Sequence, residues 1–271
     1  MITINYIGQF GNCMFQYVFA RLLVEHNLIN LGTHGLLEIE STPILPVKEP
    51  NPKRGTITIT DKMWFDWRRE FGSKIMVLDP DWDYMVSGYF QDAELFNKYS
   101  EQIKGFFKLD YPRADKDQTI VMVRLGDFIH SCYNSEIIHY KWYQEVLRQI
   151  PGQKVFTITS NNLSKSPSSK ELESKYLKEI LTPDDIILSP QSNMIAEFLE
   201  VMKYKRIVCS NSTWGWWAAF LSQAQEIYTH QKYGSFGVKE IKTHGIHVNQ
   251  LCNIRNVSKP IDGDFIDITQ L

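Results

Sequence analysis

The sequence predicts an α/β protein with mainly parallel β-sheets, and three observations lead to this class. Short β-rich runs alternate with amphipathic runs of helical length in the second half of the chain, which indicates βαβ units. The 271 residues are enough for one large α/β domain or two domains of ordinary size. The composition is 43% hydrophobic and 22% charged, which is typical of a globular protein.

The first half of the chain opens with a predicted strand and a predicted buried helix. Residues 2–7 alternate in the manner of a strand, and from Met14 on apolar residues recur at helical spacing on most sides. Between them lies Gly8-Gln9-Phe10-Gly11-Asn12, whose glycines allow a tight turn. Residues 47–55 are predicted to form a loop and residues 55–60 a short strand.

The second half predicts a regular series of elements. The predicted strands are residues 119–125, 154–160, 184–189, 206–210 and 226–230. The predicted helices are residues 139–150, 171–180, 193–204 and 213–224, with an exposed loop at 161–170. A stretch rich in charge at 112–117 separates the two halves, so we expect one lobe at 1–114 and another at 115–271.

Charge and cysteine usage narrow the function classes. The net charge is −2 without a long run of Lys or Arg, which argues against a nucleic-acid partner. The four cysteines form no CxxC pair, so zinc and redox motifs are not indicated and a reduced, cytoplasmic location is expected. Residues 207–225 carry no charge but contain polar residues and glycine, so we expect a strand, a turn and a helix there rather than a membrane span. Peripheral membrane contact is compatible with this pattern.

The ends of two predicted strands carry the candidate chemistry, because ligands of parallel α/β sheets bind beyond the carboxyl ends of the strands. Arg124 and Asp127 follow one strand, and Ser210-Asn211-Ser212-Thr213 joins another strand to a helix start. Backbone N–H groups and the helix dipole favour an anion at the second place, and Arg124 offers a forked positive charge for a diphosphate. The same residues allow a plain alternative, in which Ser212 or Thr213 caps the helix and Arg124 pairs with Asp127.

Four segments, in chain order, carry a resemblance to a known family. They are GQFGNCMFQYVFARLL at 8–23, SGYFQDAELF at 87–96, VMVRLGDF at 121–128 and SNSTWGWWAAFL at 210–221. They resemble the G-G-L-G-N-Q-M-F-Q-Y-A-F, G-Y-W/F-Q-S-E-K-Y-F, H-x-R-R-G-D-Y and A-N-S-T-F-S-W-W-A-A-W-L blocks of glycosyltransferase family 11, the bacterial-type α-1,2-fucosyltransferases. The first and last blocks are long and unusual in composition, which makes the joint match specific.

The resemblance implies a GT-B-like fold of two Rossmann-type lobes with a cleft between them. It implies inverting transfer of L-fucose from GDP-β-L-fucose, in α-1,2 linkage, to a hydroxyl of an oligosaccharide or glycolipid, without a metal or another cofactor. The residues expected to bind the donor are Gly11, Asn12, Arg124, Glu197, Asn211, Ser212 and Thr213. Among them, Glu197 is expected to accept the guanine N–H groups.

Catalysis and acceptor binding are expected to use a few further residues. Arg124 would stabilise the charge that grows on the β-phosphate, and Asp127 is the candidate general base. Trp64 and Trp67 lie three residues apart and are candidates for stacking on an acceptor sugar, with packing as the alternative for at least one of them. The tryptophans that follow the anion site are expected to belong to the core; they are Trp214, Trp216 and Trp217.

Several positions depart from the family pattern. Met122 stands in place of the His of H-x-R-R-G-D, Leu125 in place of its second Arg, and Glu197 in place of an Asp. Gln9 replaces a Gly and Cys13 replaces a Gln in the first block. These departures leave three alternatives open: a transferase of another nucleotide sugar, a non-catalytic relative that binds a GDP-sugar or a glycan, and an unrelated Rossmann-like protein.

Overall fold

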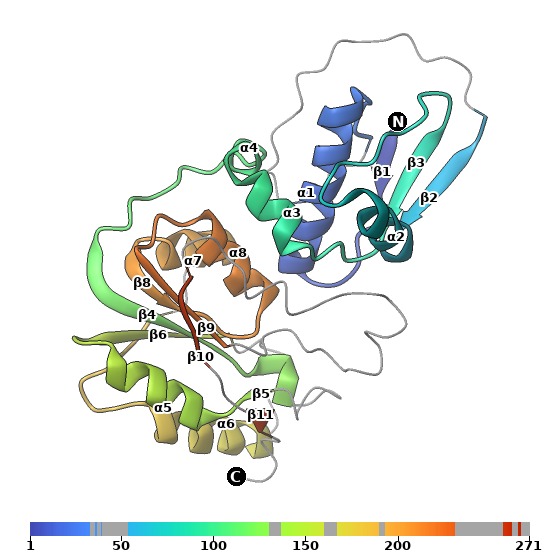
Figure 1. Ribbon diagram of the computed structural model, residues 1–271. Coiled ribbons are helices and arrows are strands. Elements are labelled where there is room, and N and C mark those ends of the chain that lie inside the picture. The colour runs from blue at the N-terminus through green and yellow to red at the C-terminus, as the bar shows by residue number, and fades with distance from the viewer. Residues whose placement is uncertain are drawn as a thin grey trace. The chain divides into compact units, whose positions relative to one another are not determined.

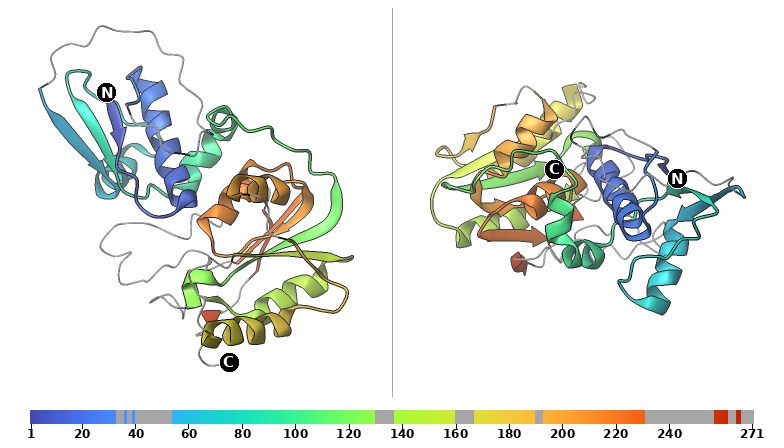
Figure 2. Two further views of the ribbon diagram at one scale, coloured as in Figure 1. Left: turned by 180° about the vertical axis from the view of Figure 1, so that it is seen from behind. Right: turned by 90° about the horizontal axis from the view of Figure 1, so that it is seen from above.

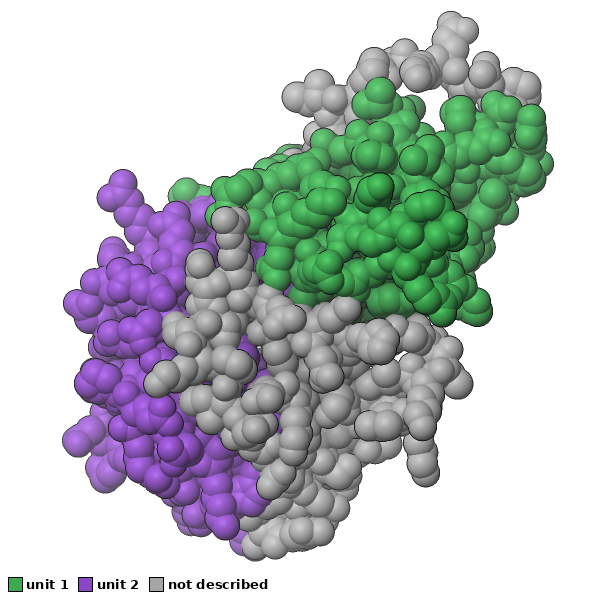
Figure 3. Space-filling view, viewed as in Figure 1, with its two compact units in different colours: residues 1–110, 237–250 green, residues 111–236, 251–271 purple. Residues whose placement is uncertain are grey.

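The computed structural model describes most of the chain as two compact units. The described residues are 1–32, 36, 39, 54–129, 137–159, 167–189, 193–230, 257–261 and 265–266. Those up to Asp110 form unit 1 and those from Tyr111 on form unit 2 (Figure 3). The assignment of 1–114 to the acceptor and of 115–271 to the nucleotide sugar stays a prediction.

Unit 1 is a three-stranded parallel sheet with helices. Its strands are β1 (Ile2–Ile4), β2 (Thr56–Thr60) and β3 (Asp83–Ser87), and its helices are α1 (Phe10–Asn27), α2 (Asp61–Phe71), α3 (Ala93–Lys98) and α4 (Ser100–Lys104). The strand order is β1-β3-β2, and both pairs are parallel (Figure 1). Parallel neighbours need a crossover connection, and α2 supplies the one from β2 to β3.

Helix α1 is buried on most of its sides, which confirms the predicted buried helix. It begins at Phe10, so the start that the apolar spacing indicated at Met14 is wrong. The reason is Gly8, whose φ of +85° lets the chain leave β1 and enter the helix within a few residues. Gly11 and Asn12 therefore belong to the first turn of α1 rather than to a loop.

Unit 2 is built on a larger sheet. Its strands are β4 (Lys116–Arg124), β5 (Ile137–Ile138), β6 (Lys154–Thr159), β7 (Ile186–Ile187), β8 (Tyr204–Val208), β9 (Glu226–His230), β10 (Val257–Ile261) and β11 (Phe265–Ile266). Its helices are the 3₁₀ turn η1 (Gly126–Ile129), α5 (Tyr140–Gln149), α6 (Pro167–Ile180), α7 (Met194–Val201) and α8 (Thr213–Leu221). The predicted α/β class with mainly parallel sheets is confirmed, because every strand pair of the six-stranded sheet is parallel and only β5 and β11, among the described strands, pair antiparallel.

The strand order of the large sheet is that of a doubly wound Rossmann-type fold. It reads β10-β9-β8-β4-β6-β7, so that the first strand, β4, lies at the centre. The chain winds outward from β4 through β6 to β7, and then returns to start the other half with β8 on the opposite side of β4. Helices α5 and α6 cover one face of the sheet, and α7 and α8 cover the other (Figures 1 and 2). The order reverses between β4 and β8, which is where ligands bind in sheets of this kind.

Helix α8 carries several buried aromatic side chains. Trp214, Trp216 and Trp217 are all buried, which confirms them as core residues, and the rings of Trp216 and Phe220 stack with centroids 4.8 Å apart. Their burial explains why α8 is apolar around its whole circumference. Within the described ranges, no helix combines the length and apolar character of a membrane span.

Several element boundaries differ from the sequence prediction. Helix α6 starts at Pro167, so the loop predicted for 161–170 is wrong at its end; Pro suits a first helical turn because it lacks only an N–H that has no partner there. Strand β4 starts at Lys116, inside the predicted linker, and β7 is only two residues long. Helix α7 stops at Val201, because β8 already begins at Tyr204. Most of the predicted loop 47–55 lies outside the described residues.

Candidate functional site

The reversal of strand order in unit 2 brings the two predicted donor segments together. Arg124 is the last residue of β4, and Ser210-Asn211-Ser212 leads from the neighbouring β8 into α8. The last paired residues of the two strands are Val121 and Val208, so β4 continues past the end of this pairing. Arg124 and the start of α8 therefore both lie at the carboxyl edge of the sheet, where a parallel α/β fold binds its ligand.

The start of α8 has the properties of an anion seat. Ser212 is the N-cap residue, yet its side chain makes no capping hydrogen bond in the described structure, and the first turn contains no acidic residue. The hydroxyl of Ser210 is buried without a hydrogen-bond partner among the described residues, and its Oγ lies 3.6 Å from where a Cβ on Gly215 would be. Ser210 precedes the helix, and its hydroxyl can donate a hydrogen bond to a phosphate oxygen. The uncapped N–H groups of the first turn of α8 can donate to the same phosphate group. The predicted seat residues Asn211 and Ser212 are buried, and Thr213 is half-buried.

Arg124 supplies the permanent positive charge at this edge. Its side chain is half-buried, and its backbone is in register with Thr159 of β6. Asp127 follows in η1, where the structure describes its backbone only. Its role as base and its pairing with Arg124 thus stay predictions. Further along the chain, His139 caps α5 by accepting the N–H of Lys141 on its Nδ1 at 3.2 Å.

Glu197 reaches the sheet from α7. Its carboxylate accepts a hydrogen bond from the hydroxyl of Thr157 on β6, with 2.5 Å between Oγ1 and Oε1. A carboxylate has about four lone-pair sites, so this bond fixes Glu197 and leaves acceptor capacity for a ligand. Thr157 was missed in the sequence, although it lies only two residues before the strand end.

Contacts across the sheet connect Glu197 to the anion seat. Thr157 pairs with Met122 of β4, and the Sδ and Cε of Met122 lie 3.1 Å from where a Cβ on Gly215 would be. The ring of Phe198, next to Glu197, meets the edge of Trp214 at 5.6 Å between centroids. The carboxylate and the seat are therefore on the same face of the sheet, under α7 and α8.

Two departures from the family pattern lie in the core around this site. Met122 and Leu125 are both buried, at 1% and 0% exposure. Met122 fills the space between β4 and α8, where Gly215 lets the helix approach closely. Among the residues that match the H-x-R-R-G-D block, Arg124 is thus the one that contributes a cation.

A second arrangement of polar groups lies in unit 1, at the start of α1. The side chain of Gln16 accepts the N–H of Ile7 at 2.9 Å and donates to its carbonyl at 2.7 Å. The Oδ1 of Asn12 accepts a hydrogen bond from the Nε2 of Gln91 at 3.1 Å. A Cβ on Gly8 would lie 2.4 Å from Asn12 Nδ2, so only glycine leaves room for this amide. Gln16 and Gln91 were missed, although both stand in the segments that carry the family resemblance.

The thiol of Cys13 also contacts this loop. Its Sγ lies 3.8 Å from the carbonyl oxygen of Gly8. Burial raises the pKa of the Cys13 thiol, which keeps it protonated and able to donate at neutral pH. Cys13 therefore supports the turn rather than acting as a nucleophile.

The two tryptophans proposed for acceptor binding have different surroundings. Trp64 is fully buried, its Nε1 donates to Asp92 at 3.0 Å, and its ring meets that of Phe19. This placement favours packing for Trp64. Trp67 is half-buried, donates to the carbonyl of Lys74 at 2.9 Å, and stacks near Phe71 with centroids 4.2 Å apart. Of the two, Trp67 is the one with exposed surface on which a sugar can stack.

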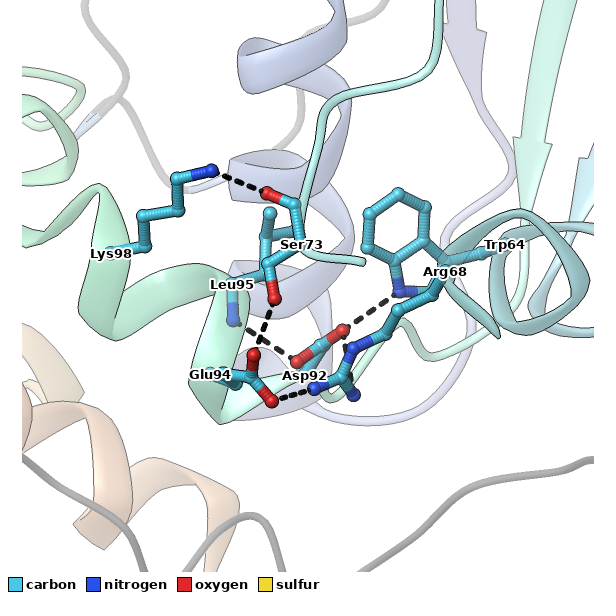
Figure 4. A network of polar contacts seen from close by, with 7 residues as sticks. All are labelled: Trp64, Arg68, Ser73, Asp92, Glu94, Leu95 and Lys98. Atoms are coloured by element: carbon cyan, nitrogen blue, oxygen red, sulfur yellow. Dashed lines mark hydrogen bonds and ion pairs between the residues drawn. The ribbon is translucent and has the colours of Figure 1, made fainter. Parts of the chain in front are cut away.

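A charged network surrounds Trp64 (Figure 4). Arg68 lies 3.1 Å from the Asp92 carboxylate and also pairs with Glu94, which accepts a hydrogen bond from Ser73 at 2.7 Å. Burial raises the pKa of Asp92, in spite of its hydrogen bonds and of Arg68. The Ser73 hydrogen bond and the Arg68 charge lower the pKa of the more exposed Glu94. Across the described ranges, no cluster of three or more His, Cys, Asp or Glu is arranged to hold a metal ion.

Comparison with known proteins matches most of the chain. The model of the family described as Glycosyl transferase family 11 matches residues 1–235. This range contains all four segments that resemble the family blocks, and it includes described residues of both units. A comparison with curated proteins found no match.

Proposed function

The chain belongs to glycosyl transferase family 11 and is a glycosyltransferase of the fucosyltransferase type. From this premise we propose that it transfers L-fucose from GDP-β-L-fucose to a hydroxyl of a glycan acceptor, with inversion and in α-1,2 linkage. The observation that carries the proposal is the anion seat of unit 2. It is supported by the buried hydroxyl of Ser210, unpartnered among the described residues, and by the uncapped start of α8, which lie at the same edge of the sheet as Arg124.

In the proposed reaction, the acceptor hydroxyl attacks C1 of fucose from the face opposite GDP. The C1–O bond to the β-phosphate breaks as the new glycosidic bond forms, and negative charge grows on the phosphate. Arg124 and the N–H groups at Ser212 and Thr213 stabilise this charge, which can lower the barrier by about 3–4 kcal/mol per donor. The proton of the acceptor hydroxyl passes to Asp127, and the reaction needs no metal.

Donor recognition in this proposal depends on Glu197. Its carboxylate accepts the N1–H and N2–H₂ of guanine, while Thr157 holds it in place through the hydrogen bond of 2.5 Å. Gly11 and Asn12 are further donor-binding residues, Gly11 because it allows close approach and Asn12 because it offers an amide. Trp67 is the proposed stacking surface for an oligosaccharide or glycolipid acceptor, and we place the reaction in the cytoplasm.

Calorimetric titration of the purified protein tests the donor site directly. GDP-fucose, GDP-mannose, GDP and UDP are each titrated without metal. We expect GDP and its sugars to bind and UDP not to bind, because uracil does not present the paired N–H donors that Glu197 accepts. Failure of every guanine nucleotide to bind would contradict the proposed donor. Equal binding of GDP-fucose and GDP-mannose would contradict specificity for fucose.

A non-catalytic relative is the second candidate, and one observation favours it. Met122 and Leu125 replace a histidine and an arginine and are buried, so the block keeps a single cation. Such a protein would bind GDP-fucose without consuming it. Release of GDP in the presence of a panel of glycan acceptors decides between the two candidates.

A further inference from the structure

Residues 89–92 of unit 1 form a strained segment that is anchored on helix α2. Phe90 has a φ of +49°, which is a left-handed conformation that a bulky residue rarely adopts. The carboxylate of Asp61 accepts the N–H of Tyr89 at 2.9 Å and that of Phe90 at 2.7 Å. A Cβ on Gly88 would lie 2.6 Å from Asp61 Oδ2, so glycine is needed there for the carboxylate to approach. The strain at Phe90 is thus held by two charge-assisted hydrogen bonds.

The other end of the segment is anchored by the same helix. Asp92 is fully buried, accepts a hydrogen bond from Trp64 and forms an ion pair with Arg68 (Figure 4). Asp61, Trp64 and Arg68 are spaced i, i+3 and i+7 along α2 and therefore share one face of it. One helix face thus fixes the backbone on both sides of Gln91.

Between these anchors, Gln91 is directed at Asn12. Its side chain is buried, with 6% exposure for the residue, and its Nε2 donates to Asn12 Oδ1 at 3.1 Å. With its Oδ1 turned toward Gln91, Asn12 has the Nδ2 hydrogens and the second lone pair of Oδ1 left to offer. The amide of Asn12 is therefore held in one of its two possible orientations.

We propose that Gln91 is a positioning residue for fucosyl transfer: it holds the Asn12 carboxamide so that Nδ2 donates a hydrogen bond to an oxygen of the sugar nucleotide. This inference rests on the proposed function, in which Asn12 binds the donor. The path of the nearby backbone does not depend on Gln91, because Gln16 holds Ile7 through both of its backbone polar groups. Loss of the Gln91 donor would change the amide orientation and leave the turn in place.

Gln91→Glu tests the proposal, because it keeps the size of the side chain and replaces the NH₂ donor by an acceptor. Asn12 would then turn its own NH₂ toward the new carboxylate and present an oxygen to the substrate. We expect kcat for transfer from GDP-fucose to fall about tenfold, the effect of one well-placed hydrogen bond, with little change in KM for the acceptor. The matched control is Gln102→Glu, an exposed position of α4 with the same change of charge, which should keep the wild-type rate.

A pH profile and a double variant separate positioning from a merely structural effect. The activity of Gln91→Glu relative to the wild type should rise as pH falls, because a protonated carboxyl can again donate to Asn12 Oδ1. In the Asn12→Ala background, Gln91→Glu should cause no further loss of rate. A wild-type rate for Gln91→Glu, or additive losses in the double variant, overturns the inference while fucosyl transfer stands. A wild-type protein without fucosyl transfer overturns the proposed function and this inference with it.

Discussion

The molecule has two strand-to-helix passages whose helix starts are uncapped, and the two are held in place by different interactions. The chain passes from β1 to α1 in unit 1 and from β8 to α8 in unit 2. In both, the described N-cap side chain, Gln9 or Ser212, makes no capping hydrogen bond, and the first helical turn carries no acidic residue. Each helix therefore presents N–H groups that its own cap does not satisfy.

The difference between the passages lies in what holds them. The passage into α1 uses the positive φ of Gly8 and amide hydrogen bonds from Gln16 and Gln91. The passage into α8 has no residue with positive φ at described positions 209–212 and is held by burial instead. The first should thus be sensitive to backbone and amide changes, and the second to the charge and hydroxyl groups that face a ligand.

The largest expected effect belongs to Arg124, the last residue of β4, which is the neighbour of β8 in the sheet. Arg124→Ala should lower kcat for the proposed fucosyl transfer by about 10²–10³-fold, because in the proposed reaction Arg124 is the cation that opposes charge on the β-phosphate. Steady-state rates of GDP release measure this loss. The matched control is Arg148→Ala on the exposed side of α5, where the guanidinium pairs with Glu145 at 2.9 Å. Near-full activity of Arg124→Ala would exclude Arg124 from catalysis.

The next effect belongs to the passage at β1, through Gly8. Gly8→Ala should lower transfer activity about tenfold or more, because the new Cβ would meet Asn12 Nδ2 at 2.4 Å and push the amide from its place. Gly152→Ala is the control: its φ of +82° makes alanine as unfavourable there, by about 1 kcal/mol, but nothing lies within 4 Å of the new Cβ. Thermal unfolding should show a loss in both variants, and activity should fall only in Gly8→Ala. Equal activity in the two would mean that the position of Asn12 does not matter.

Much of the fold follows from the sequence, because unit 2 is built from regular patterns. The β-branched runs and the intervening helices have the periods of their elements, so the strands at β4, β6, β8 and β9 are all found. The elements missed in unit 1 are short or depend on tertiary contacts. Helix α3 has six residues, and its N-cap Asp92 is defined by Trp64 and Arg68 from another helix. The cap itself is local, since Asp92 accepts the N–H of Leu95 at 3.1 Å, but the contacts that bury its carboxylate are visible only once the two helices are packed.

Some residues of the candidate site could be placed from the sequence, and others could not. The position of Arg124 and of residues 210–213 at one edge of the sheet could be predicted, because they end or follow neighbouring strands and parallel topology gathers strand ends at one edge. Their role in binding an anion stays a prediction. Thr157, Gln16 and Gln91 could not be predicted, because each acts by a hydrogen bond to a partner far along the chain or on another element. A lone polar residue in an apolar run gives no sign of which partner it will meet.

Two carboxylates of unit 1 should respond to pH in opposite directions. The network beside Gln91 contains Asp92, whose pKa is raised by burial, and Glu94, whose pKa is lowered by Ser73 and Arg68. A raised carboxyl pKa favours folding at low pH, and this contribution is lost as pH rises from the ordinary range through the raised value. The contribution of Glu94 is present above its ordinary pKa of 4.5 and is lost as pH falls through the lowered value.

Two variants measure these opposite signs. The stability difference between the wild type and Asp92→Asn should shrink as pH rises from about 4. The stability difference between the wild type and Glu94→Gln should shrink as pH falls below the ordinary glutamate pKa of 4.5. Urea unfolding between about pH 3 and 7 gives both differences. The same trend with pH in both variants would contradict the assigned directions.

The smallest expected effect is at Gly215, which allows α8 to lie close to β4. Gly215→Ala places a Cβ 3.1 Å from the Sδ and Cε of Met122, the movable end of a flexible side chain. Alanine also favours the helix by up to about 1 kcal/mol, so the net change in stability should stay within that range. Affinity for GDP should not change, because the first turn of α8 keeps its N–H groups in place. Thermal unfolding and calorimetric titration check both statements, with Gly215→Ala/Met122→Leu as the variant that relaxes the contact. A tenfold loss of GDP affinity that the double variant restores would show that Met122 sets the position of the anion seat, and burial alone would then not account for this passage.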